Sequence, residues 1–169
     1  MATTQAQRSK IADQKMQLRQ ALWPDIDEEE LWHRKASKGW LTVPRVMPLL
    51  LRIMDMLAPK GKPVSATYLD LWCRTYDDSF VVASKPREMA YFAGFTGDRA
   101  QHTWTTRIRQ LAELGFIKFK EGANGPVNYV LLLNPFQVVR QHIDSGELRG
   151  DAENTLRERM IEIGATDLD

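Results

Sequence analysis

The sequence predicts a mostly helical protein with one small β-hairpin. Helical spacing of apolar residues recurs along most of the chain, whereas two β-rich runs, 116–121 and 127–133, flank a Gly-Ala-Asn-Gly-Pro turn. The densest signals lie between residues 84 and 133. A short helix is expected at 86–93, a glycine-bounded turn at 94–97 and a longer helix at 98–114, and the hairpin follows directly. The rest of the chain is organised around this stretch.

The N-terminal segment is expected to be helical and to pack against the core. A helix over 8–22 has only a thin apolar stripe, which predicts that it docks on another element. Asp27 is expected to N-cap a second helix that continues through Ala36. Trp23, Trp32 and Trp40 fall in the first forty residues and predict the same packing; a peptide-binding aromatic groove is the alternative.

The first helix of the predicted core follows residue 41, where large apolar residues recur at helical spacing. Because proline is tolerated only in the first turn, Pro48 predicts that this helix begins near Val46 or bends. Ser65 is expected to N-cap the next helix, which runs to about Thr75. Residues 80–82 fit either a short strand or a packed loop. Two C-terminal helices are expected at 136–143 and 151–163, the second capped by Gly164.

Composition excludes several function classes. The single cysteine, Cys73, cannot form an intramolecular disulfide, and three scattered histidines leave little for a metal site, so we expect neither metal nor cofactor. No apolar run has the length of a signal peptide core or a membrane span, which predicts a cytoplasmic protein without a membrane partner. Cys73 follows Trp72 in an apolar helix and is expected to be a small core residue rather than a nucleophile. We therefore predict that the protein is not an enzyme.

Charge is unevenly distributed along the chain, although the net charge is only +1. Residues 85–120 hold seven basic and three acidic side chains, a local charge of +4. Residues 141–169 hold eight acids and three arginines, a local charge of −5. Because phosphate binding depends on a local patch, this distribution favours nucleic-acid binding by the middle of the chain. Mixed charge on ordinary helical surfaces is the alternative.

The order helix, turn, helix and hairpin over 84–133 resembles the winged helix-turn-helix superfamily, without matching one specific family. The resemblance implies a winged-helix domain at 39–134, with helical extensions at 1–38 and 135–169. It also implies a recognition helix at about 98–114 for the major groove and a wing at 116–133 for the backbone or minor groove. The segment 65–82 is longer than a minimal version of this fold needs.

The helix over 98–114 has one face for a core and one for solvent. Ala100, Trp104, Ile108 and Leu111 repeat at helical spacing and are expected to be buried. The other side carries side chains that can bond bases or phosphates: Arg99, His102, Thr103, Thr105, Thr106, Arg109 and Gln110. Base contacts usually come from the N-terminal half of such a helix. The outside of any amphipathic helix also looks like this, which is the alternative.

The hairpin and the shorter helix add four candidate contacts. Lys118, Lys120 and Asn124 are expected to touch phosphates or a groove, although lysines on a hairpin also discourage edge-to-edge pairing. Arg87, near the start of the shorter helix, is expected to bond phosphate together with the helix amides, or else to be an ordinary solvated arginine.

These observations predict a sequence-specific double-stranded DNA-binding protein, a transcription regulator or a replication accessory factor associated with the nucleoid. The alternative is a winged-helix adaptor that binds another protein and no DNA. A homodimer would double the DNA site, and the apolar stripes at 8–22 and 151–163 are its candidate seams. Intramolecular docking explains either stripe equally well.

Overall fold

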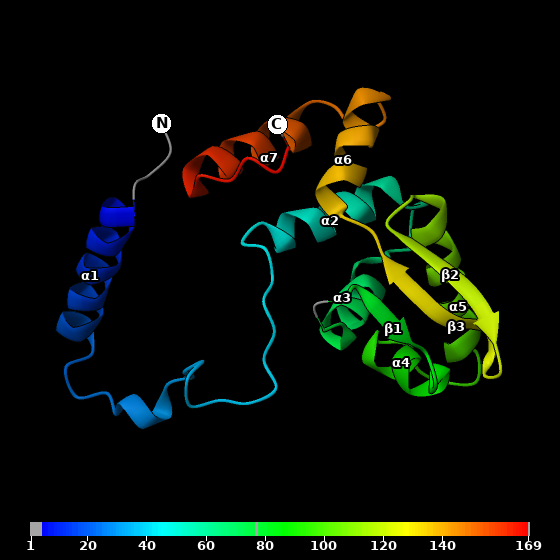
Figure 1. Cartoon of the computed structure of the whole chain (residues 1–169), viewed down its shortest axis with the longest axis horizontal. Coiled ribbons are helices and arrows are strands. Elements are labelled where there is room, and N and C mark those ends of the chain that lie inside the picture. The colour runs from blue at the N-terminus through cyan, green and yellow to red at the C-terminus, as the bar shows by residue number, and fades with distance from the viewer. Residues whose placement is uncertain (1–4, 77, 169) are drawn as a thin grey trace.

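The computed structural model describes residues 5–76 and 78–168, and this part of the chain is mostly helical with a small antiparallel sheet (Figure 1). Its elements are α1 (Gln5–Leu22), the 3-10 helix η1 (Glu28–Glu30), α2 (Met47–Leu57), α3 (Ser65–Arg74), β1 (Phe80–Val82), α4 (Pro86–Phe92), α5 (Ala100–Glu113), β2 (Ile117–Gly122), β3 (Gly125–Leu132), α6 (Pro135–Asp144) and α7 (Asp151–Ile163). The prediction of a mostly helical chain with a hairpin is confirmed. The helix predicted at 98–114 is α5, which is shorter by two residues at its start and by one at its end.

The sheet has three strands in the order β1-β3-β2, and both pairings are antiparallel. Val130 of β3 lies opposite Val81 of β1 on one side and Phe119 of β2 on the other. Residues 80–82 are therefore a strand, although the sequence fitted a packed loop equally well. The short strand was one of the two predicted alternatives, and β1 pairs with β3 although α4 and α5 separate them along the chain.

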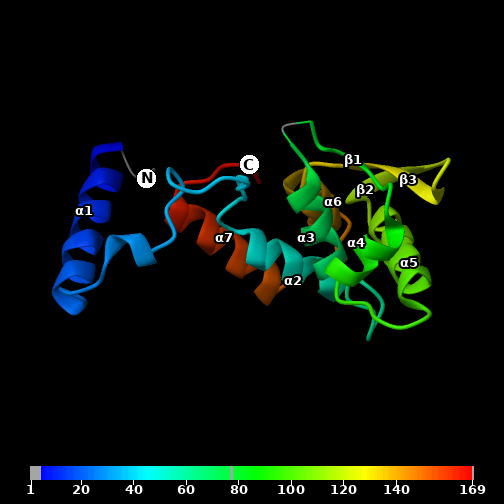
Figure 2. The same cartoon turned by 90° about the horizontal axis from the view of Figure 1, so that it is seen from below.

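Helices α3, α4 and α5 lie beneath one face of the sheet (Figure 2). Trp104 of α5, Tyr68 of α3 and Phe116 are the largest fully buried side chains, and the Tyr68 and Phe116 rings meet edge to face at 6.1 Å. The predicted buried stripe of α5, which includes Ile108 and Leu111, is confirmed. Aromatic packing of this kind fixes α5 against the sheet.

The junction of α2 and α3 differs from the sequence prediction in one respect. Helix α2 begins at Met47, so Pro48 falls in the first turn, where a missing N–H costs nothing. Ser65 does not cap α3: Val64 occupies the N-cap position, and the capping carboxylate comes from Asp55 on α2. The sequence could not reveal this cap because its two halves lie on different helices.

The C-terminal helices share the core of the central region rather than forming a separate body. Asn134 caps α6 by accepting a hydrogen bond from the N–H of Phe136 at 3.0 Å, and Gly164 ends α7 with φ +65° as predicted. Leu156 and Met160 of α7 belong to the same buried cluster as Trp104. The apolar stripe of α7 is therefore covered within the chain, as the docking alternative proposed.

The N-terminal segment lies apart from the core, at the opposite end of the molecule from the sheet (Figures 1 and 2). Asp27 caps as predicted, accepting from the N–H of Glu29 at 2.9 Å, but only one 3-10 turn follows and the helix expected through Ala36 is wrong. A short helix that no neighbouring element covers is marginal in water.

The tryptophans of this segment are likewise not packed against the core. Trp23, Trp32 and Trp40 are 58%, 71% and 45% exposed, and the apolar side chains Ile11, Leu18 and Leu22 of α1 are exposed too. The predictions that α1 docks and that the tryptophans pack on the core are therefore wrong.

Within the described ranges, no helix combines the length and apolarity that crossing a bilayer requires.

Candidate functional site

The pair α4 and α5 is joined by a tight turn that sets the direction of α5. Gly94 and Gly97 adopt φ of +87° and +81°, a region that other L residues rarely enter. The N–H of Phe95 donates to the carbonyl of Ala90 at 2.9 Å, and the N–H of Ala100 donates to the carbonyl of Gly97 at 3.2 Å. The turn predicted from the two glycines therefore closes one helix and opens the next.

The solvent side of α5 carries a row of polar side chains. His102 and Arg109 are exposed, with the half-buried Thr106 between them, and Arg99 is exposed at the N-cap. Residues spaced by three and four lie on one line of a helix, so His102, Thr106 and Arg109 form a single row. The structure thus brings together four of the predicted contacts: Arg99, His102, Thr106 and Arg109.

The threonines of α5 are partly engaged within the helix. The hydroxyls of Thr105 and Thr106 donate to the carbonyls of Gln101 and His102, both at 3.0 Å. Such back-bonding uses the hydroxyl proton. Each oxygen can still accept a hydrogen bond, and each methyl group can still make an apolar contact. Thr103 is half-buried on the side toward Gln110.

Gln110 is a correction to the predicted contact set. Its side chain is only 7% exposed, and its Oε1 lies 3.5 Å from Nη1 of the buried Arg107. The Arg107 guanidinium also lies 5.7 Å from the centre of the Phe95 ring. Gln110 is therefore part of an internal polar contact and does not belong to the exposed row of α5. The sequence did hold a sign of this contact, because Arg107 precedes Gln110 by three residues and residues three apart are neighbours on a helix.

The hairpin places its predicted residues in two different locations. Asn124 is exposed at the tip, where its backbone N–H donates to Oδ1 of the buried Asn128 at 2.8 Å. Lys118 and Lys120 lie along β2 instead, opposite Leu131 and Tyr129 of β3. Asn128 was not among the predicted residues, although a lone amide in an alternating strand is a recognisable sign of a polar role.

Arg87 is exposed on α4, next to an ion pair of Lys85 with Glu88 at 3.5 Å. Helix α4 has only seven residues, and its first position is Pro86, which has no N–H to offer. Arg87 was predicted to bind phosphate together with the amides of this helix. The helix therefore offers fewer N–H donors for that phosphate than expected. The side chain alone remains as a contact.

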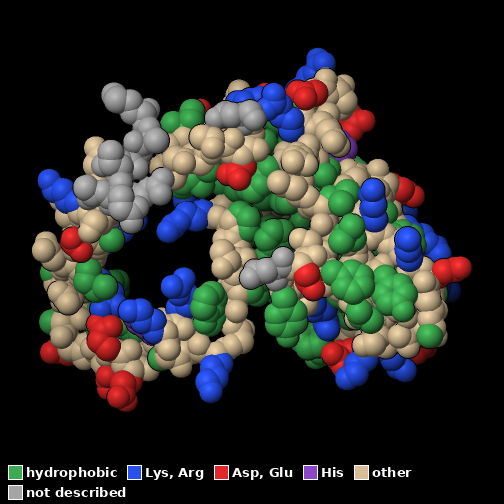
Figure 3. Space-filling model, in the orientation of Figure 1, with side chains coloured by type: hydrophobic (Ala, Val, Ile, Leu, Met, Phe, Trp, Pro, Cys, Tyr) green, Lys and Arg blue, Asp and Glu red, His purple; other side chains and the backbone are tan. Residues whose placement is uncertain are grey.

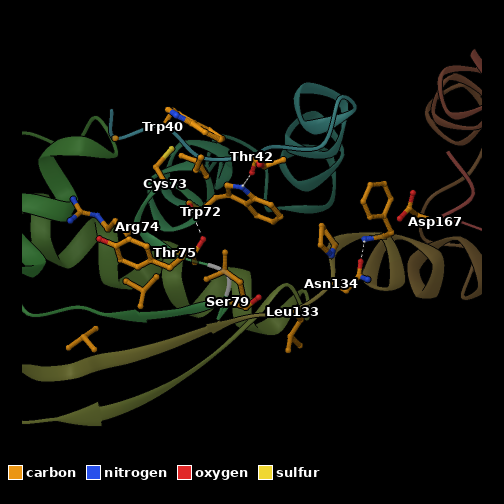
Figure 4. A pocket seen from close by; sticks show the side chains of 18 residues that line it. Trp40, Thr42, Trp72, Cys73, Arg74, Thr75, Ser79, Leu133, Asn134 and Asp167 are labelled. Carbon is orange, nitrogen blue, oxygen red and sulfur yellow. Dashed lines mark hydrogen bonds between the residues drawn. The ribbon is translucent and has the colours of Figure 1, made fainter. Parts of the chain in front are cut away.

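A cleft of about 1060 Å³ is lined by residues outside α5 (Figure 4). It is bounded by residues 39–42, the end of α3, β1 and the start of α6. Trp72 fixes one wall, because its Nε1 donates to the carbonyl of Thr42 at 3.2 Å. Arg74 and Asp167 bring charge to a lining that is otherwise apolar or neutral.

Cys73 lines this cleft and is exposed, so the prediction of a small core residue is wrong. Partial burial of the thiol raises the pKa of Cys73, and the nearby Asp70 carboxylate raises it further. A raised pKa disfavours the thiolate and therefore nucleophilic attack.

Among the described residues, no three His, Cys, Asp or Glu side chains gather as a metal site.

Comparisons of the chain with models of protein families, with curated proteins and with solved structures found no match.

Proposed function

We propose that residues 39–134 form a winged helix-turn-helix that binds double-stranded DNA with sequence preference. Helix α5 enters the major groove, and the tip of the β2–β3 hairpin reaches the neighbouring backbone or minor groove. The protein acts as a regulator of transcription or as an accessory factor of replication in the cytoplasm. It does so without an enzymatic step or a cofactor.

The single observation that carries this proposal is the exposed row on α5. Arg99, His102 and Arg109 project from a helix whose other face is anchored by the buried Trp104. Arginine can bond guanine bidentately, and histidine and threonine can bond bases or phosphates. A rigid helix with a wholly polar outer row suits groove reading better than protein docking, which favours aromatic anchors.

The arrangement of elements supports the same proposal. The order α3, β1, α4, α5, β2, β3 and the strand order β1-β3-β2 fit a winged helix whose three helices are α3, α4 and α5, with α2 as an addition that packs on α3. Asn128 holds the hairpin tip in place, which leaves Asn124 presented beyond the end of the sheet. The phosphate contacts would come from Arg87 on α4 and from this tip.

Duplex binding by the full chain tests the proposal. We expect fluorescence anisotropy with a labelled duplex pool to detect binding at ~50 mM salt. The logarithm of the binding constant should fall linearly with the logarithm of the salt concentration, with a slope of several units. Selection from random duplexes should then enrich one sequence. No duplex binding at that salt concentration would refute the proposal, and binding without enrichment would refute sequence preference.

A matched pair of variants places the contact on α5. Arg99→Ala with Arg109→Ala removes two positive charges from the proposed interface. Arg157→Ala with Arg159→Ala removes two from α7, which lies away from α5 in both views (Figures 1 and 2). We expect the first pair to lower the salt slope by about 2 and the second to leave it unchanged. Equal effects would mean that the attraction is non-specific.

One observation favours the adaptor alternative. The outer face of the sheet exposes Phe80, Val82, Tyr129 and Leu131, an apolar surface that duplex reading does not use. Exposed apolar patches mark protein-binding sites. An adaptor would keep this surface as its main contact and would show no duplex binding in the anisotropy experiment.

A further inference from the structure

The outer face of the sheet is apolar where an antiparallel sheet usually turns polar residues to water. Phe80 and Val82 of β1 and Tyr129 and Leu131 of β3 are between 40% and 50% exposed, while their neighbours in the strands point into the core. The registers pair Phe80 with Leu131 and Val82 with Tyr129, so the four side chains form one continuous patch. We call these four residues the apolar sheet patch.

Two lysines border the apolar sheet patch. In the pairing of β2 with β3, Lys118 lies opposite Leu131 and Lys120 lies opposite Tyr129. Both lysines are exposed. Figure 3 shows hydrophobic side chains gathered over the sheet with basic side chains beside them. The rings of Phe80 and Tyr129 lie within 13° of parallel with centres 6.2 Å apart, an offset arrangement that leaves ring surface accessible. The face therefore suits an occupant that is both apolar and acidic.

The N-terminal segment has this chemistry. Residues 23–32, the acidic arm, read WPDIDEEELW and hold five acids with no basic residue. Exposed Trp23 and Trp32 stand at its two ends. Asp27 is committed to the cap and Glu28 pairs with Arg19, whereas Glu29 and Glu30 make no ion pair with any described residue. Asp25 likewise makes no ion pair with a described residue, so the acidic arm offers two aromatic anchors and three available carboxylates.

We propose that two copies of the chain exchange these arms, so that the acidic arm of one copy docks on the apolar sheet patch and its lysine border in the other. The arm and the sheet lie at opposite ends of the molecule in two perpendicular views, which favours docking between copies over docking within one (Figures 1 and 2). A two-fold exchange forms the same contact twice, which adds area without a second kind of interface. Tryptophan is among the residue types enriched at the points that carry most of the binding energy of such contacts.

This exchange assigns a partner to both unpartnered surfaces at once. The four side chains of the apolar sheet patch gain cover, and so do Trp23 and Trp32 of the arm. Lys118 and Lys120 then serve self-association, while the row on α5 stays accessible to DNA. The inference does not depend on the proposed DNA binding, because mass and duplex affinity are separate measurements.

Charge exchange in the full chain tests the pairing. The sheet variant carries Lys118→Glu and Lys120→Glu, and the arm variant carries Glu29→Lys and Glu30→Lys; all four side chains are exposed, so we expect both variants to fold. Sedimentation equilibrium should give a dimer for the natural chain. Each variant alone should dissociate at least ~10-fold more readily, because like charges then face each other.

Mixing the two variants gives the decisive result. In a mixed pair, both arm–sheet contacts again join opposite charges, so the mixture should form dimers that neither variant forms alone. The chain carrying all four substitutions should also recover dimerisation, to within a few-fold of the natural chain. Lys60→Glu with Lys62→Glu, an equal change in the exposed loop after α2, should leave the mass unchanged.

Three outcomes would overturn the inference. A natural chain that stays monomeric at all concentrations excludes arm exchange, as do dimers that neither variant weakens. If a single-stranded oligothymidylate binds a monomer and Tyr129→Ala or the sheet variant abolishes that binding, the face is a base-stacking surface instead. Trp32→Ala supplies a charge-independent check and should weaken the dimer ~10-fold.

Discussion

The carboxylate of Asp55, on α2, caps α3 at Ser65. Its Oδ1 accepts hydrogen bonds from the backbone N–H groups of Val64 and Ser65 at 2.7 and 2.8 Å, and its Oδ2 accepts one from the Ser65 hydroxyl at 2.6 Å. The first N–H groups of a helix have no partner within it, and an acid there also complements the helix dipole. One side chain therefore fixes both the start of α3 and its angle to α2.

Replacing Asp55 should destabilise the fold more than replacing Ser65. Asp55→Ala leaves two part-buried N–H groups without a partner, and we expect a loss of about 2 kcal/mol in the free energy of unfolding. Ser65→Ala removes one bond and keeps both backbone caps, so the loss should be about 0.5–1 kcal/mol. Urea denaturation of the two variants measures the difference. Equal losses would mean that the backbone caps contribute little.

Neighbouring residues of α5 should separate DNA binding from stability. Arg109→Ala removes an exposed side chain from the proposed interface and should weaken duplex binding about tenfold without changing the unfolding free energy. Gln110→Ala removes the partner of the buried Arg107 and should cost about 1–3 kcal/mol of stability. Its affinity for duplex, corrected for the folded fraction, should match that of the natural chain.

The pattern of Arg109→Ala across sequences then identifies its contact. A phosphate contact weakens binding to all sequences alike, whereas a base contact relaxes preference at one base pair. Loss of duplex affinity in folded Gln110→Ala, measured by anisotropy, would contradict the internal role given to Gln110.

Gly122→Ala should disrupt the hairpin tip. A Cβ at this position would lie 2.8 Å from both Cβ and Cγ of Asn128, whose amide holds the tip through the N–H of Asn124. We expect a loss of about 1–3 kcal/mol in urea denaturation, typical of overpacking. Ala123→Ser, at the exposed neighbouring position, is the control and should be nearly neutral. A neutral Gly122→Ala would mean that the tip adjusts freely.

Cys73 should react slowly with iodoacetamide despite its exposure. Because burial and the Asp70 carboxylate raise the pKa of the thiol, the thiolate, which is the reactive form, should appear at higher pH than in a free cysteine. Asp70→Asn removes one of these causes and should move the rise in alkylation rate to lower pH. Glu88→Gln removes an equal charge that does not act on Cys73 and should leave the profile in place. An unchanged profile in Asp70→Asn would exclude the electrostatic contribution.

Local features of the sequence were sufficient to place most helices and the hairpin. The ends of α7, the turn at Gly94 and Gly97 and the buried stripe around Trp104 were all predicted, because capping, glycine conformation and helical spacing act between residues close in the chain. The exposed row of α5 followed from the same spacing. The polar character of that row was therefore available from the sequence alone.

Contacts between distant segments decided the rest. The pairing of β1 with β3, the cap that Asp55 gives α3 and the internal position of Gln110 each depend on which elements meet in space. The exposure of Trp23 and Trp32 contradicts the expectation that they pack on the core. An apolar side chain shows that burial is favourable, but it does not show which surface will bury it. Only the tertiary structure shows that those tryptophans and the outer face of the sheet are two exposed apolar surfaces without a partner in the described part of the chain.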